Sequence, residues 1–144
     1  IEQLEQWVLD NRNHLCHWFT VDDLHHLKRG GRVSSATAVI GSALGIKPVL
    51  HVDHQGHLIP VKKVRGRRQS LDALVDMMQQ TAVDPKWQTV FISHGDALDD
   101  ARYVEKRVRD AFKCKDIHIN YIGPVIGTHS GPGTVALFFM GTHK

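Results

Sequence analysis

Apolar residues recur along the chain with two different periods, which separate predicted helices from predicted strands. Spacings of three and four residues are typical of one helix face, whereas alternation or a short continuous apolar run is typical of a strand. This pattern predicts helices at 1–13, around Leu24 and Leu27, and at 34–45, 71–82 and 97–112. It predicts strands at 17–21, 49–52, 57–64, 89–94, 117–122 and 134–140.

Capping and turn residues separate these elements. Asp22 or Asp23 and Ser70 are predicted N-caps, Gly30-Gly31 ends the second helix, and 53–56 reads as a hairpin turn. Two strand–helix–strand passages, 57–94 and 89–122, suggest that some strands run parallel. We therefore predict an α+β fold with one mixed six-stranded sheet and helices packed on it. The pattern leaves open whether the helices cover one face of the sheet or both.

Composition narrows the class of protein. The chain has 144 residues with a net charge of +3 and 42% hydrophobic residues, which predicts a single globular domain over 1–144. No apolar run approaches the length of a membrane span, and the acidic, amphipathic beginning is unlike a signal peptide. The only cysteines, Cys16 and Cys114, are too few for a disulfide scaffold. We therefore expect a cytoplasmic location.

The segment Gly123–Gly133 contains four glycines and two prolines, and we expect it to be a rigid loop between the last two strands. It carries His129 and the hydroxyl residues Thr128 and Ser130. Backbone N–H groups of a glycine-rich loop can bind an anion, and a histidine there can bind a carboxylate or phosphate, or act as an acid or base. The simpler alternative is a tight connection whose histidine bonds a local carbonyl.

A second candidate is the run 62–68, in which five of seven residues are cationic. Arginine suits carboxylate and phosphate oxygens, but charged runs at strand ends are often only solvated surface. A nucleic-acid site is the weaker interpretation, because no aromatic residue interrupts the run. Arg32, after the Gly30-Gly31 turn, is a further exposed cation.

Metal and nucleophile motifs are missing from the sequence. Eleven histidines occur without an HExxH motif or the Cys/His spacing of a structural zinc site, and there is no GxSxG elbow. We therefore expect no metal site and no catalytic residue.

Four segments together carry a resemblance to a known family. LKRGGR (27–32), GIKPVL (45–50), KVRGR (63–67) and GPVIGTHSGPG (123–133) occur in the order typical of the DegV family. The resemblance extends from about residue 17 to 141. It implies two-lobed bacterial proteins that bind fatty acids, of which this chain is similar to the C-terminal lobe, with a leading helix at 1–13 and the N-terminal lobe absent.

The resemblance also implies a function and site residues. A long-chain fatty acid is held, with no cofactor, while a cytosolic partner kinase converts its carboxylate to an acyl phosphate, so the chain itself is not expected to be an enzyme. His129 is implied to bind the carboxylate, and the hydroxyl residues that complete carboxylate binding in the family are implied to lie on the absent lobe. Thr128 and Ser130, which flank His129, are our own candidates for lipid binding. Arg65, and less strongly Arg32, are implied near the site mouth, and kinase docking is assigned to Arg65, Arg67 and Arg68. The predicted helix 34–45 offers Val39, Ile40 and Leu44 for the acyl tail, although these are also ordinary core residues.

Two other functions stay open. The chain could be a phosphotransfer or hydrolytic enzyme lobe that uses His129 as a base, although it has no P-loop and no carboxylate cluster for Mg²⁺. It could also be a regulatory module that binds an anion or nucleic acid through 62–68, although we expect no nucleic-acid partner. An isolated lobe would expose apolar surface, so self-association is a fair expectation.

Overall fold

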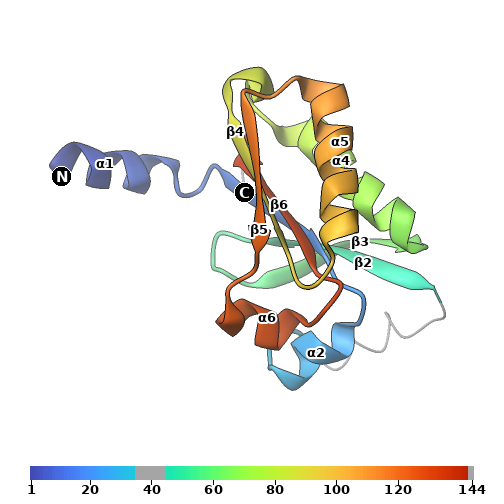
Figure 1. Ribbon diagram of the computed structural model, residues 1–144. Helices are drawn as coiled ribbons and strands as arrows, with labels where there is room; N and C mark the ends of the chain where they lie inside the picture. Colours follow the sequence, from blue (N-terminus) through green and yellow to red (C-terminus); the bar gives the residue numbers. More distant parts are fainter. Residues whose placement is uncertain (35–44, 143–144) are drawn as a thin grey trace.

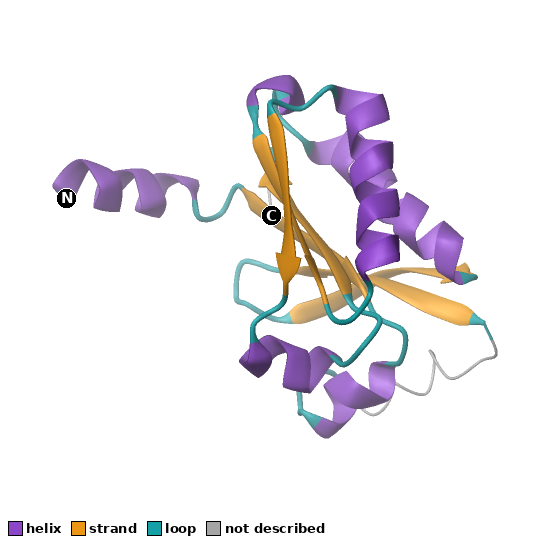
Figure 2. Cartoon of the chain, in the orientation of Figure 1, coloured by secondary structure: helices purple, strands orange, loops and turns teal. Residues whose placement is uncertain are grey.

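The computed structural model of the protein describes residues 1–34 and 45–142. Its centre is a six-stranded mixed sheet in the order β3-β2-β1-β6-β4-β5 (Figures 1 and 2). Only β4 and β5 pair in parallel, and every other neighbouring pair is antiparallel. The strands are β1 (Leu15–Thr20), β2 (Ile46–Val52), β3 (Leu58–Arg65), β4 (Thr89–His94), β5 (Asp116–Tyr121) and β6 (Val135–Met140). The predicted α+β class is confirmed.

Two long helices cover one face of the sheet, α4 (Arg67–Thr81) and α5 (Leu98–Phe112) (Figure 2). The apolar stripe of α5, Ala101, Val104 and Val108, is buried because its spacing repeats about every helical turn. Alternate strand residues face these helices and complete the main core, among them Trp18, Val90, Ile92, Leu137 and Phe139.

The opposite face is only partly covered. Two short helices, α2 (Leu24–Arg29) and α6 (Pro124–Ser130), pack against each other at one end of it (Figure 1). Leu24 and Leu27 of α2 form a second apolar cluster there with Phe19, Val21, Leu50 and Ala136. Farther along this face Phe91 stays half exposed. The long helices thus bury the main core on one face, and the short helices cover one end of the other face.

The leading helix α1 (Glu2–Asn11) projects away from the sheet (Figure 1). Its predicted stripe of Leu4, Trp7 and Val8 is present but none of its residues is buried. A short 3₁₀ helix, η1 (Pro85–Trp87), precedes β4.

Several predicted boundaries need correction. Asp23 caps α2 as predicted, accepting a bond from the His25 N–H at 2.8 Å. Ser70 is not an N-cap, because α4 begins at Arg67 and the Ser70 hydroxyl donates to the Arg67 carbonyl within its first turn.

Of the two strand–helix–strand passages, 89–122 gives the parallel pair β4–β5 as predicted. The passage 57–94 does not give a neighbouring pair, because three strands separate β3 from β4. The predicted helix 34–45 falls almost entirely outside the described residues.

The prediction of a loop over 123–133 is wrong, because residues Pro124–Ser130 form α6. Pro124 occupies the first turn, where its missing N–H costs nothing and its fixed φ suits a helix. The helix ends at Gly131, whose φ of +79° favours glycine. A side chain there would also collide with the His26 ring, 2.7 Å from an added Cβ, so the turn packs directly on α2.

Candidate functional site

A hollow of about 520 Å³ lies on the sheet face opposite α4 and α5. Its floor consists of side chains from β1, β4 and β6, and its walls come from the α2 and α6 region and from the β2–β3 hairpin. The volume falls within the range of roughly 300–1,000 Å³ that is usual for small-ligand sites. Most of the lining is apolar, namely Phe19, Leu27, Val52, Leu58, Ile122, Val125, Ile126, Ala136 and Phe138.

Three side chains able to carry positive charge line this hollow, namely His17, Arg32 and His129. His17 comes from β1, whereas His129 from α6 and Arg32 from the segment after α2 both approach Gly30. Gly30 brings them together. The Arg32 guanidinium donates to the Gly30 carbonyl at 2.7 Å, and an added Cβ on Gly30 would come within 2.3 Å of His129 Nδ1. The glycine therefore lets the imidazole pack directly on the α2 terminus. The arrangement offers donors for one anionic group at the edge of an apolar hollow.

The two hydroxyl side chains of α6, Thr128 and Ser130, form hydrogen bonds to carbonyls of the same helix. Thr128 Oγ1 donates to the Pro124 carbonyl at 2.8 Å, and Ser130 Oγ donates to the Ile126 carbonyl at 3.0 Å. Thr128 is exposed and Ser130 is buried, and neither lines the hollow. Their predicted part in lipid binding stays a prediction.

Sequence patterns did not single out Ser93, His17 or Thr134, which also line the hollow. Ser93 brings a hydroxyl from β4, and His17 packs edge-on against Phe138 at 5.4 Å between ring centroids. The sequence offered one indication of their role, because Ser93 and His17 are polar residues next to apolar residues of their strands. The register that brings them to one face is a property of the assembled sheet.

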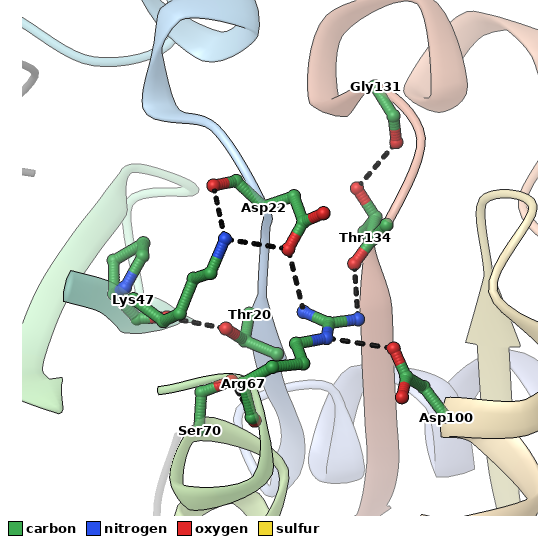
Figure 3. A network of polar contacts seen from close by, with 10 residues as sticks. Thr20, Asp22, Lys47, Arg67, Ser70, Asp100, Gly131 and Thr134 are labelled. Atoms are coloured by element: carbon green, nitrogen blue, oxygen red, sulfur yellow. Dashed lines mark hydrogen bonds and ion pairs between the residues drawn. The ribbon is translucent and has the colours of Figure 1, made fainter. Parts of the chain in front are cut away.

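Arg67 stands at the centre of a polar network beside the site (Figure 3). Its Nε donates to Asp100 at 2.8 Å, and its Nη2 donates to the carbonyl of Gly133 at 2.5 Å. Its Nη1 lies 3.9 Å from Asp22 and is buried without a hydrogen-bond partner among the described residues. Lys47 approaches the same Asp22 carboxylate at 2.8 Å. The network thus ties α4 and α5 to the turn that follows His129.

The three arginines predicted for kinase docking therefore occupy different surroundings. Arg67 is largely buried in this network, Arg68 lies over the Tyr103 ring with 3.8 Å between its Cζ and the ring centroid, and Arg65 is exposed at the end of edge strand β3. Arg65 does not line the hollow, so the structure brings Arg32, but not Arg65, to His129. Val39, Ile40 and Leu44 lie outside the described residues.

Two pKa shifts have clear causes elsewhere in the chain. Burial raises the pKa of the Cys16 thiol, which favours its neutral form. The His57 N–H donates to Asp53, and this bond lowers the pKa of that carboxyl. Within 1–34 and 45–142, the histidines, cysteines and acidic residues form no group of three that could hold a metal ion. The described helices include none long and apolar enough to span a membrane.

Comparison with known proteins gives one family. The model of the DegV family of uncharacterised proteins matches residues 1–142. The chain belongs to the DegV family. A DegV domain-containing protein of Clostridium perfringens is 49% identical over all 144 residues of this chain, and the match covers 50% of that relative.

Solved DegV structures share the fold. A fatty-acid-binding DegV protein of Streptococcus agalactiae has a TM-score of 0.82 and 30% identity over 96% of this chain and 48% of its own. The Fatty Acid Kinase B3 protein of Streptococcus pneumoniae, loaded with linoleic acid, has a TM-score of 0.87 at 17% identity over 96% of this chain and 49% of its own. The chain thus spans about half the length of the DegV proteins it matches.

Proposed function

We propose that the protein binds a long-chain fatty acid, with the carboxylate at His129 and Arg32 and the acyl tail in the hollow. The observation that carries this proposal is the combination of a mostly apolar hollow with two hydrogen-bond donors, the His129 imidazole and the Arg32 guanidinium, that both approach Gly30. The fatty-acid-binding relative from Streptococcus agalactiae supports the same ligand class.

The apolar part of the hollow accounts for most of the binding free energy. About fifteen methylenes at roughly 0.8 kcal/mol each give on the order of 12 kcal/mol before the cost of association. A charge-assisted hydrogen bond adds only about 1.5–3 kcal/mol. His129 and Arg32 therefore chiefly orient the ligand, and the tail supplies the affinity.

We extend the proposal to presentation of the carboxylate to a partner kinase that forms an acyl phosphate. This step rests on the DegV motifs VRGR and HxGPG and on the exposed position of Arg65. The likeness to Fatty Acid Kinase B3 concerns the fold alone. In this proposal the chain holds the substrate, and the partner supplies the nucleotide chemistry.

The first experiment is lipid extraction and mass spectrometry on the full-length natural protein, purified without added lipid. A stoichiometric fatty acid is the expected result and would also identify the tail. A protein that is empty and takes up neither oleate nor palmitate would overturn the proposed function. The cationic donors of the hollow would then serve a different anion.

A further inference from the structure

Side chains on the open sheet face form a row that crosses the strands at right angles. The register pairs Phe138 with His17 and Val52 with Leu58. Because Trp18 is opposite His51 in the antiparallel β1–β2 pair, His17 comes opposite Val52. These four residues all line the hollow, so its lining continues from the floor on β6 and β1 to the wall that the β2–β3 hairpin forms.

The hollow therefore has two chemically different ends. Ser93 lies on β4, and the turn that follows His129 contacts Gly95 just after β4, where the Gly133 N–H donates to the Gly95 carbonyl at 2.7 Å. At the β2–β3 hairpin the lining is instead Val52, Gly56 and Leu58. We propose that Val52 and Leu58 form the end wall for the ligand's methyl terminus and so determine which acyl chain length the protein prefers. This inference rests on the proposed function and assigns its specificity to the hairpin.

The width of the sheet gives the expected length. From Ser93 on β4 to Leu58 on β3 there are four strand-to-strand steps, β4 to β6, β1, β2 and β3. Four steps of about 4.8 Å span about 19 Å across the strands. Ser93 pairs with Ala136, two residues along β6 from Phe138, so the path also shifts by about 7 Å along the strands and measures about 20 Å. An extended hydrocarbon chain advances roughly 1.25 Å per bond, given C–C bonds of about 1.5 Å and tetrahedral angles. The path thus corresponds to a chain of about sixteen carbons.

The hairpin is held in place by its own turn. Asp53 Oδ1 accepts bonds from the N–H groups of Gln55 and His57, both at 2.9 Å. The Asp53 N–H in turn donates to the His57 carbonyl at 3.0 Å. A turn fixed by three hydrogen bonds supports the two side chains beside it, as a wall that selects length requires.

The test compares chain lengths in the full-length natural protein, with affinities measured for laurate, palmitate and arachidate. Leu58→Trp should weaken palmitate at least tenfold while laurate, which is four carbons shorter, changes less than twofold. Leu58→Ala should improve arachidate relative to palmitate by about fourfold or more, because each added methylene that becomes buried is worth about that factor. Val52→Trp is a second blocking variant on the neighbouring strand.

Ile59→Ala is the matched control, since Ile59 is the next residue of β3 and its side chain points to the other face of the sheet. It should leave the length preference unchanged. If both blocking variants weaken laurate and palmitate equally, or if Ile59→Ala shifts the preference as much as Leu58→Ala does, the assignment to the hairpin is wrong. A wild-type protein that binds none of the three acids would instead overturn the proposed function.

Discussion

At the scale of single residues, His129 and Arg67 have separate tasks in one region. His129 lines the hollow and packs on Gly30. Arg67 does not line the hollow and stabilises the turn after His129 by donating to the Gly133 carbonyl. In the proposed function, His129 contacts the ligand and Arg67 supports the backbone turn that follows His129. Substitutions at the two positions should therefore change different measured quantities.

Replacing His129 should weaken ligand binding with little change in folding. For His129→Ala we expect palmitate affinity to fall about tenfold or more, since a hydrogen bond to a charged group is worth about 1.5–3 kcal/mol. Titration calorimetry on the full-length protein measures this loss. His118→Ala is the control, because His118 is an exposed histidine of β5 that does not line the hollow. Equal affinity of His129→Ala and wild type would exclude the assigned carboxylate contact.

Replacing Arg67 should instead lower stability. Arg67→Met removes the bonds to Asp100 and Gly133 and leaves Asp22 with Lys47 alone, so we expect the free energy of unfolding to fall by about 2 kcal/mol. Urea unfolding checks this value. Arg68→Met loses only a cation–π contact at an exposed site and should cost less than about 1 kcal/mol. Similar losses in the two variants would mean that the Arg67 network contributes no special stability.

At the scale of elements, the β2–β3 hairpin should show a pH-dependent stability. The bond from the His57 N–H lowers the pKa of Asp53, so the folded state favours the carboxylate. Its stabilising effect is therefore present at neutral pH and is lost as the pH falls through this lowered pKa. Asp53→Ala should unfold at lower urea concentration than wild type at pH 7, and the difference should shrink in acid.

Gln55→Ala is the control for this prediction, because Gln55 contributes its backbone N–H, and not its side chain, to the turn. It should unfold close to wild type at both pH values. A difference between Asp53→Ala and wild type that is the same at pH 7 and in acid would show that the carboxylate charge is not involved.

The elements also show which parts of the structure a sequence can predict. Strand β4 and the buried stripe of α5 follow from periodicity, because one-sided burial imposes a period of two or 3.6 residues. Periodicity failed for α6, a short helix with no buried apolar stripe, where glycine and proline suggested a loop. It also failed at the start of α4, where the cations at 65–68 concealed a helix that begins at Arg67.

The site was less predictable than the elements for a physical reason. His129 and Arg32 were candidates from their motifs, but nothing in the sequence indicated that they meet at Gly30 or that Ser93 of β4 lines the same hollow. These residues come close together because the sheet places β1, β6 and β4 side by side, although these strands are far apart in the sequence. Local patterns carry no record of such pairings, so the place of Leu58 in the lining, on which the proposed end wall rests, could not be predicted from them.

At the scale of the whole molecule, the proposed ligand site and the proposed kinase-docking residue Arg65 lie at different places. His129 and Arg32 lie at the hollow, whereas Arg65 is at the end of edge strand β3 and outside the lining. An exposed guanidinium suits docking to a carboxylate or phosphate of a partner. Transfer and retention should therefore be separable by substitution.

Arg65→Ala should reduce acyl-phosphate formation by the partner kinase while palmitate affinity stays within twofold of wild type. The loss should be larger at low salt, because exposed charges mainly accelerate association and are screened by ions. Initial rates at several ionic strengths, with lipid-loaded full-length protein as substrate, provide the measurement. Lys86→Ala, which removes an exposed cation of η1 next to Trp87, is the control and should leave the rate unchanged. Parallel loss of binding and transfer in Arg65→Ala would move Arg65 into the ligand site, and an unchanged rate would remove it from the docking surface.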